Sequence, residues 1–243
     1  FLASGDGGDE LFGGYTFRYS KFLSLIKPDS TPLDKIQAYL SCHERDWVPD
    51  QEKIFNSKTN FSWKSINSIF MPFFDNSLSP LTQVFLADYN GKLLYNFSII
   101  ANKINQFFNL KPVTPILDPE LISYASHLSP ESKYDLNKNK GKIPLRFLLS
   151  KHKCDSLISK EKLGFSVNTI NLWNSIGKEL CELYLDNARI VEDGWINKEW
   201  IYSNIKKSDL DVKYVNKFLG LLSLEIWYRL FITKEMNAKT KLS

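Results

Sequence analysis

The fold of this chain is decided by one stretch near its start, Ser4-Gly5-Asp6-Gly7-Gly8-Asp9-Glu10-Leu11-Phe12-Gly13-Gly14-Tyr15, which follows the apolar residues Phe1-Leu2-Ala3. Its glycines let backbone N–H groups approach an anion without side-chain obstruction, and a loop that opens into a helix adds a favourable dipole. Its acids would repel a phosphate unless a cation lay between them, and carboxylate oxygens are the ligands that Mg²⁺ prefers. The stretch therefore predicts the end of a core strand and then a loop that holds a magnesium polyphosphate.

Other glycine-rich motifs do not fit these residues. A P-loop requires Gly-Lys-Ser/Thr after its spacer, a Rossmann fingerprint requires a third glycine where Glu10 stands, and an EF-hand requires acids two residues apart, where Gly8 follows Asp6. A surface turn built from Asp-Gly remains the alternative, because this dipeptide is frequent in tight turns. A turn accounts for the glycines but not for three acids within five residues.

Four segments together resemble a known family. The opening stretch resembles the second ATP-site motif in the C-terminal synthetase domain of glutamine-dependent asparagine synthetases. Thr114-Pro115-Ile116-Leu117-Asp118 is similar to the family's Val-Pro-Phe-Leu-Asp segment. Lys142-Ile143-Pro144-Leu145-Arg146 resembles its Lys-x-x-Leu-Arg helix start, and Lys162-Leu163-Gly164-Phe165 resembles its Lys-x-Gly-Phe loop. The segments occur in family order, and the resemblance covers nearly the whole chain.

This resemblance implies a fold that is mainly α over these residues: the helical C-terminal part of an α/β PP-loop synthetase domain of the adenine nucleotide α-hydrolase type, with one opening strand and the nucleotide loop. We expect residues 1–243 to form a single partial domain. Its parts are a strand end and ATP/pyrophosphate loop (1–16), a helical middle (30–130), a lysine-bearing helix and loop (140–168) and C-terminal helices (169–243). We expect the first phosphate loop, of Ser-Gly-Gly-x-Asp-Ser type, and a glutaminase domain with a catalytic cysteine to lie upstream.

The resemblance also implies a reaction, that of a ligase of asparagine and amino-acid biosynthesis with ATP and Mg²⁺ as cofactors. The side-chain carboxylate of aspartate, or of a similar acid, attacks the α-phosphate of ATP to give an acyl-adenylate and pyrophosphate. Ammonia that the glutaminase domain releases from glutamine then displaces AMP. The resemblance is compatible with a homodimer.

Roles for individual residues follow from the matched motifs. Ser4 and Gly5 would contact the adenylate mainly through their backbone, and Gly7 and Gly8 are further nucleotide-binding positions. Asp9 would bind the metal and its pyrophosphate. The catalytic residues would be Asp6, which orients the substrate or the ammonia, and Lys162, which steadies the transition state.

Two further assignments concern charge around the loop. Lys142 would bind the phosphates, and it lies 20 residues before Lys162, so a fold can bring both ammonium groups to one polyphosphate. Glu10 is expected to cap or brace the helix that follows, since acids are favoured in a first turn.

The middle of the chain departs from the family pattern. The family's Asp-Arg-x-x-Met is replaced by Asn102-Lys103-Ile104-Asn105-Gln106, and its Glu-x-Arg by Lys111-Pro112-Val113. If the family's Glu-Arg pair is structural bracing, the change means repacking; if it shapes the substrate pocket, a different acid is activated. Two alternatives to asparagine synthesis therefore remain open: a catalytically silent binding or scaffold module, and a relative that amidates another acid.

Composition excludes several other classes of protein. With 243 residues, 43% of them hydrophobic, the chain can bury a core, and its net charge of +4 comes from scattered lysines, so no nucleic acid partner is expected. No stretch approaches the about 20 apolar residues of a membrane span. The dispersed Cys42, Cys154 and Cys181 are expected to be free buried thiols in a cytoplasmic protein, and no zinc-ligand spacing occurs.

Helix starts are marked by a capping residue followed by proline at Thr31-Pro32, Ser79-Pro80 and Asp118-Pro119. An apolar stripe with helical spacing predicts a long C-terminal helix and comprises Val215, Leu219, Leu222, Ile226 and Leu230. A further helix is expected to begin at Thr169. Residues 56–74 are ambiguous between helix and irregular structure, while residues 133–140 and 159–168 are expected to be loops.

Overall fold

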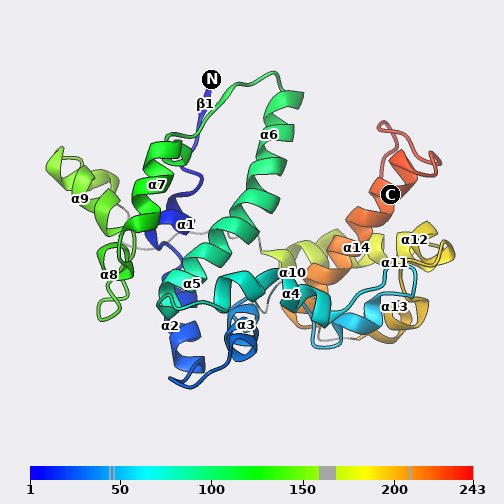
Figure 1. The fold of residues 1–243 in the computed structure, drawn as a ribbon. Coiled ribbons are helices and arrows are strands. Elements are labelled where there is room, and N and C mark those ends of the chain that lie inside the picture. Colours follow the sequence, from blue (N-terminus) through cyan, green and yellow to red (C-terminus); the bar gives the residue numbers. More distant parts are fainter. Residues whose placement is uncertain (44, 46, 159–167, 208–209, 243) are drawn as a thin grey trace. The chain divides into compact units, whose positions relative to one another are not determined.

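The computed structural model describes residues 1–43, 45, 47–158, 168–207 and 210–242. The chain divides into two compact units (Figure 1). Unit 1 combines Phe1–Cys42 with Asn67–Leu163, and unit 2 combines His43–Ile66 with Gly164–Ser243. The described part of the chain is mainly helical, as predicted, and none of its helices has the length and hydrophobicity that crossing a membrane requires.

Unit 1 holds the opening stretch, a small sheet and most of the helices. Its strands are β1 (Leu2–Ala3) and β2 (Pro112–Val113). Its helices are α1 (Gly8–Phe12), α2 (Thr16–Leu25), α3 (Pro32–Ser41), α5 (Pro80–Ala87), α6 (Ser98–Phe107), α7 (Pro119–His127), α8 (Pro130–Lys133) and α9 (Ile143–Lys151), with short helical segments η2 (Asp88–Phe97), η3 (Pro115–Leu117) and η4 (Asp155–Leu157). Helix α4 (Trp63–Phe74) begins among the residues of unit 2 and ends among those of unit 1.

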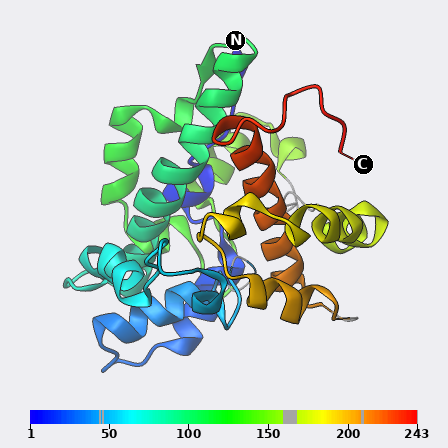
Figure 2. The same ribbon diagram turned by 90° about the vertical axis from the view of Figure 1, so that its right-hand side faces the viewer.

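The two strands form a parallel pair, and this pair positions the site. Leu2 is opposite Pro112 and Ala3 is opposite Val113. The carboxyl ends of parallel strands meet at one edge of a sheet, so the loop after β1 lies beside the Thr114–Asp118 segment after β2. In both views the N-terminus accordingly lies near the loop that follows α6 (Figures 1 and 2).

Strand β2 corrects the prediction of a single opening strand. Pro112 and Val113 carry no alternation of apolar and polar residues from which a strand could be predicted, and proline cannot donate a ladder hydrogen bond. The pairing depends instead on two bonds from distant residues: Leu2 donates its N–H to the Lys111 carbonyl at 2.9 Å, and Ser4 donates to the Val113 carbonyl at 3.0 Å.

A continuous helical run from Pro80 to Phe107 passes through unit 1. It consists of α5, the π-helical segment η2 and α6. Ser79 caps its start as predicted, because its side chain accepts from the Thr82 N–H and Pro80 occupies the first turn. The run places Asp88 in the core, and its last part, α6, lies beside the strand pair.

The core of unit 1 has two apolar clusters. The larger consists of buried residues from α2, α3, α4 and α5 together with two tyrosines outside them: Tyr15, Tyr19, Phe22, Ile36, Ala38, Tyr39, Phe74, Val84, Phe85, Ala87 and Tyr134. In the smaller, Leu11 and Phe12 of α1 pack with Ala125 of α7. The smaller cluster fixes α1, and with it the glycine-rich loop, against α7.

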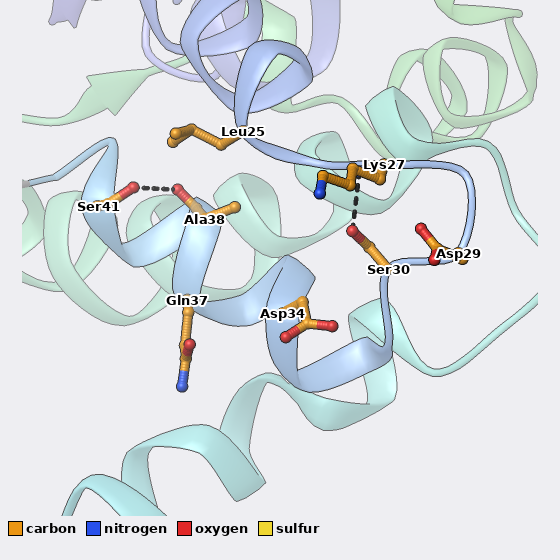
Figure 3. Close-up of a pocket in the computed structure, with 8 residues that line it drawn as sticks. All are labelled: Leu25, Lys27, Asp29, Ser30, Asp34, Gln37, Ala38 and Ser41. Carbon is orange, nitrogen blue, oxygen red and sulfur yellow. Dashed lines mark hydrogen bonds between the residues drawn. The ribbon is translucent and has the colours of Figure 1, made fainter.

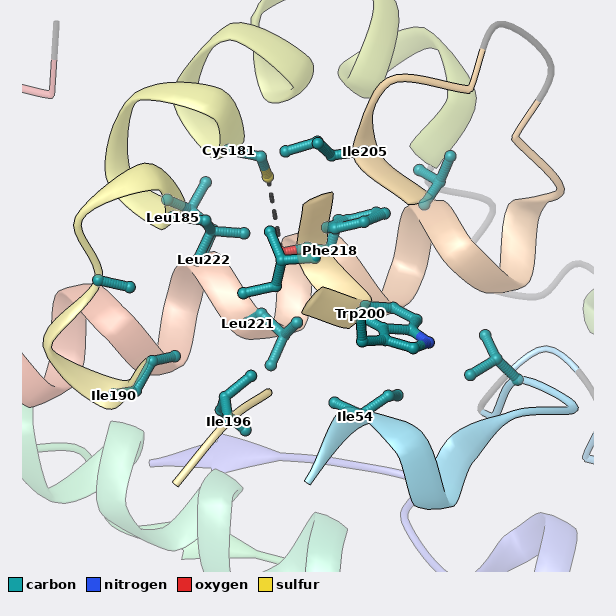
Figure 4. Packing of buried hydrophobic residues seen from close by; sticks show 14 of the residues in the cluster. Ile54, Cys181, Leu185, Ile190, Ile196, Trp200, Ile205, Phe218, Leu221 and Leu222 are labelled. Carbon is teal, nitrogen blue, oxygen red and sulfur yellow. Dashed lines mark hydrogen bonds between the residues drawn. The ribbon is translucent and has the colours of Figure 1, made fainter. Parts of the chain in front are cut away.

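Unit 2 has a separate core around its longest helix. Its elements are η1 (Gln51–Ile54), α10 (Thr169–Leu172), η5 (Trp173–Gly177), α11 (Lys178–Asp186), α12 (Arg189–Glu192), α13 (Lys198–Ile205) and α14 (Val212–Phe231). Figure 4 shows Phe218, Leu221 and Leu222 of α14 packed among side chains of α11, α12 and α13. Val215 is fully buried and Leu222 nearly so, which confirms the predicted apolar stripe.

The helix starts predicted at Thr31-Pro32, Asp118-Pro119 and Thr169 are confirmed. Residues 56–74 divide into an irregular part and α4. The predicted loop at 133–140 is wrong at its first residue, because Lys133 closes α8 and is only 4% exposed. The three cysteines are free as predicted, but of these only Cys181 is buried. Residues 159–167 of the predicted loop lie outside the described residues.

Candidate nucleotide site

The glycine-rich loop is shaped by packing against the segment that follows β2. A side chain at Gly7 would place its Cβ 2.4 Å from Leu117 Cδ2, and one at Gly8 would lie 3.3 Å from Ile116 Cδ1. Gly7 also has a φ of 87°, which side chains disfavour. Two of the segments on which the family resemblance rests, Ser4–Tyr15 and Thr114–Asp118, are therefore in direct contact.

The first part of the loop presents unused backbone donors. Within the described part of the chain, no hydrogen bond engages the N–H groups of Gly5, Asp6 or Gly7. The next N–H, that of Gly8, donates to the Gly5 carbonyl at 3.1 Å. Successive N–H groups next to a left-handed residue form the concave arrangement that binds anions.

Asp9 and Lys142 meet at the end of this loop. Lys142 Nζ lies 2.9 Å from Asp9 Oδ1, and the two side chains are 36% and 29% exposed. The backbone of Lys142 is held as well, because its N–H donates to the Phe12 carbonyl at 2.8 Å. With a φ of 57°, Lys142 adopts a left-handed conformation that is uncommon for residues other than glycine, and such strain clusters at functional sites.

Two glycines make this close approach sterically feasible. A Cβ at Gly14 would lie 1.7 Å from Asp9 Oδ1 and 2.7 Å from Lys142 Cε. A Cβ at Gly141 would lie 1.8 Å from the Gly13 carbonyl oxygen. Arg146 holds the same turn from α9, since its Nε donates to the Gly141 carbonyl at 3.0 Å.

The remaining predicted site residues are distributed as follows. Ser4 Oγ donates to Asp6 Oδ2 at 2.9 Å, and both Asp6 and Gly5 are exposed. The structure thus brings Ser4, Gly5, Asp6, Gly7, Gly8, Asp9 and Lys142 to one edge of unit 1. Lys162 lies outside the described residues.

Glu10 braces the residues that follow α1 and, within the described part of the chain, makes no capping bond at the start of that helix. Its side chain is 3% exposed and accepts a 2.5 Å hydrogen bond from the Tyr15 hydroxyl. Burial, and then the bond to Glu10, raises the pKa of Tyr15 well above its usual range, so Tyr15 stays protonated and remains the donor. Lys92 Nζ lies 4.2 Å from the centre of the Tyr15 ring.

Asp88 lies in the same buried layer. It is fully buried, accepts from the Tyr39 hydroxyl at 2.8 Å and has Arg18 Nη1 at 3.9 Å. Burial raises the pKa of Asp88 to about 6, against the opposing effect of Arg18 and Tyr39. Glu10, Tyr15, Tyr39 and Asp88 therefore form a buried polar layer that supports the loop.

Sequence reasoning missed the supporting residues Arg18, Lys92 and Asp88. Asp88 stands out only as an acid at an apolar position of the α5 pattern, and no sequence signal pairs it with Tyr39 or Arg18. Asn105, a buried polar residue of α6, was noted only as part of a departure from the family pattern.

The donor set at the loop fits a magnesium ion. Across the residues that the structure describes, no three His, Cys, Asp or Glu side chains form a complete metal cage. Such a cage is not needed, because Mg²⁺ is usually bound through one or two carboxylates, with water and substrate phosphates completing its shell. The partly exposed Asp9 carboxylate, beside unused backbone donors, meets this requirement.

Another pocket of unit 1, of about 510 Å³, lies between the end of α2 and α3 (Figure 3). Its polar groups serve local structure. Ser30 Oγ accepts from the Lys27 N–H at 2.8 Å, Ser41 Oγ donates to the Ala38 carbonyl at 2.8 Å, and Asp34 completes the capping box of α3. We therefore place the candidate site at the loop rather than here.

Comparison with known proteins shows the family of this chain. The family model for asparagine synthase matches residues 2–229, so the chain belongs to the asparagine synthase family. Proteins of Mycobacterium tuberculosis (strain H37Rv) and Mycobacterium bovis that are provisionally named glutamine-hydrolysing asparagine synthetases are each 27% identical to it, over 74% of this chain. The chain spans 31% of the length of these curated relatives. No solved structure matches it.

Proposed function

We propose that this chain binds the magnesium-pyrophosphate end of ATP in an amide-forming ligase of asparagine synthetase type. In this proposal the two units are the helical C-terminal part of a PP-loop synthetase domain. The observation that carries it is the 2.9 Å contact between Asp9 and Lys142, which joins the loop after β1 to the start of α9. A carboxylate and an ammonium group at one edge supply a metal ligand and a phosphate ligand together.

The reaction would proceed in two steps. An oxygen of the acid's carboxylate attacks the α-phosphorus of ATP, the bond between the α- and β-phosphates breaks, and pyrophosphate leaves. The nitrogen of ammonia, supplied by a glutaminase domain, then attacks the acyl carbon, and AMP leaves.

The residues of this chain act mainly on the leaving pyrophosphate. The Lys142 ammonium group, held at the loop by Phe12 and Asp9, offsets the negative charge that develops there. The N–H groups of Gly5, Asp6 and Gly7 are free to donate to the nucleotide's phosphate oxygens. Bound Mg²⁺, with Asp9 as its protein ligand, would add Lewis-acid stabilisation of the same charge. Asp6 orients the acid or the ammonia, and Lys162 steadies the transition state.

A test uses protein expressed from the whole reading frame that contains these residues. Pyrophosphate release is measured with ATP, Mg²⁺ and a panel of acids that includes aspartate. Asp9→Asn and Lys142→Met should each reduce release by about 10²-fold, the order of loss expected when one electrostatic contact to the transition state is removed. Lys138→Met is the matched control, because Lys138 pairs with Asp135 at 3.7 Å on an exposed surface of the same unit.

A second candidate function is a catalytically silent module that keeps the fold. The observation that favours it is Asn102, which replaces the acid of the family's Asp-Arg-x-x-Met segment and lines a pocket beside Asp6. The panel of acids separates the two candidates. If all the acids leave ATP intact in a folded protein, the silent module is the better assignment.

A further inference from the structure

A pocket of about 290 Å³ opens beside the nucleotide loop, on one face of the strand pair. Leu2 and Ser4 line it from β1 and its loop, and Pro112 and Thr114 line it from β2 and the following segment. Side chains two residues apart on a strand share a face, so Lys111 and Val113 project to the opposite side. Lys111 Nζ accordingly lies 5.5 Å from the centre of the Phe1 ring.

The residues that depart from the family pattern differ in whether they line this pocket. Lys111 and Val113 do not line the pocket, whereas Asn102 does. Of the changed positions, Asn102 is therefore the one that alters the chemistry of this pocket.

Helix α6 contributes a polar stripe to the pocket wall. Ser98, Asn102 and Asn105 stand at positions i, i+4 and i+7, which share one face of a helix, and all three line the pocket. The stripe faces the side where Ser4 and Asp6 lie, because these residues complete the same lining.

One group of this stripe is buried without a hydrogen-bonding partner among the described residues. This group is the Ser98 Oγ atom. Asn105 is 8% exposed as a residue, and it lines the pocket on the same face. Buried polar groups are nearly always satisfied, so a molecule that fills the pocket would be expected to supply the bond that Ser98 lacks.

The charge of the pocket limits what this molecule can be. Asp6 is the ionisable residue among the described residues that line it, and no lysine, arginine or histidine does so. A carboxylate placed against Ser98 and Asn105 would lose its hydration without meeting a cation, whereas an amide or hydroxyl would be satisfied by these groups. Asp6 at the same wall favours an ammonium group.

We propose that this pocket binds the non-reacting end of the substrate acid, and that this end carries an amide or hydroxyl beside an amine rather than a second carboxylate. This inference rests on the proposed function, since it names the substrate class for the same site. Among derivatives of aspartate, the α-amide has these features: a free side-chain carboxylate to be activated, an ammonium group for Asp6 and an uncharged amide for Ser98 and Asn105.

The test is a calorimetric titration of protein expressed from the whole reading frame with L-aspartate α-amide and, separately, with L-aspartate. We expect the amide to bind at least about tenfold more tightly, the factor that one unsatisfied buried group typically costs. Asn105→Leu should weaken binding of the amide about tenfold for the same reason. Asn102→Lys places a cation at an exposed position of the lining and should shift the preference toward aspartate. Lys103→Ala, an exposed residue of α6 outside the lining, is the control and should change neither affinity.

The outcomes separate this inference from the proposed function. Tighter binding of L-aspartate, or binding of neither compound, overturns the inference. Pyrophosphate release that is fastest with aspartate in protein from the whole reading frame also overturns it, yet supports the ligase assignment. Binding of the amide that depends on Asn105, without pyrophosphate release, supports the pocket assignment while the ligase assignment fails. If Asn105→Leu does not fold, the preference of Asn102→Lys decides.

Discussion

Replacement of Gly14 by alanine should separate ligand binding from stability. Gly14 is not among the residues with positive φ, so its backbone accepts alanine. The new Cβ would lie 1.7 Å from Asp9 Oδ1 and 2.7 Å from Lys142 Cε, at the point where these side chains form their 2.9 Å contact. An ordinary contact requires about 3.5 Å, so the Asp9 carboxylate must move by roughly 1.5 to 2 Å.

The displacement has different consequences for the fold and for the site. The overlapping atoms lie at the ends of the Asp9 and Lys142 side chains, which are about one-third exposed. An ion pair with this exposure contributes about 1 kcal/mol or less to stability. For a chain of this size, that lowers Tm by no more than about 4 °C. In contrast, a shift of more than about 1 Å in a residue that binds the metal or the phosphates lowers the catalytic rate on the order of 10²-fold.

The assay compares Gly14→Ala with Gly91→Ala, whose Cβ would meet Phe70 at an ordinary 3.7 Å in the same unit. Calorimetry gives Tm and the affinity for magnesium pyrophosphate, and protein from the whole reading frame gives the rate of pyrophosphate release. Full affinity and full release in a folded Gly14→Ala protein would refute the role assigned to the Asp9–Lys142 contact. If this variant fails to fold, Lys142→Met removes the same contact without adding an atom, and its affinity decides.

Four further predictions follow from the packing and the buried charges. Gly141→Ala, whose Cβ would overlap the Gly13 backbone oxygen at 1.8 Å, should lower the free energy of unfolding by about 3 kcal/mol, measured by urea denaturation. Asp88→Asn should abolish one pH dependence of stability. Burial raises the pKa of Asp88 from 3.8 to about 6, so the native state favours the protonated form of this carboxyl group. The free energy of unfolding of the wild type should therefore fall by about 3 kcal/mol relative to Asp88→Asn as the pH rises from about 4 to 6, and should then stay level. Gly220→Ala, at an exposed position inside α14 with nothing within 4 Å, should raise the free energy of unfolding by about 1 kcal/mol, seen as a higher Tm. Gly5→Ala should leave that free energy within about 0.5 kcal/mol while the affinity for Mg-ATP falls, which calorimetry and a binding titration check together.

Local features of the fold could be predicted from the sequence because their signals are local. Thr31 and Asp118 each cap a helix whose first residue is a proline, and the interactions lie within a few residues of each cap. The stripe of α14 likewise repeats at helical spacing. Strand β2 could not be predicted, because it exists only through its pairing with Leu2 and Ala3, which lie far from it in the sequence.

The residues of the candidate site also divide into those that a local motif predicts and those that only the folded chain reveals. Asp9 and the loop glycines could be predicted from one continuous motif, and Lys142 from a separate motif that resembles the family. Their 2.9 Å contact required the structure, since it depends on how α9 packs against α1. Asp88 and Asn105 could not be assigned in advance, because burial alone makes a polar residue costly, and burial is a property of the folded chain.

The glycines of the loop show which part of the motif the protein fold alone explains. Gly7 is required by Leu117 and by its positive φ, and Gly14 by Asp9 and Lys142. At Gly5 a Cβ would meet nothing within 4 Å, and its φ is not positive, so the described residues tolerate a larger residue there. Because the neighbouring N–H groups of Gly5 and Asp6 are unused, a ligand that approaches the backbone is the physical reason that remains for a glycine at this position.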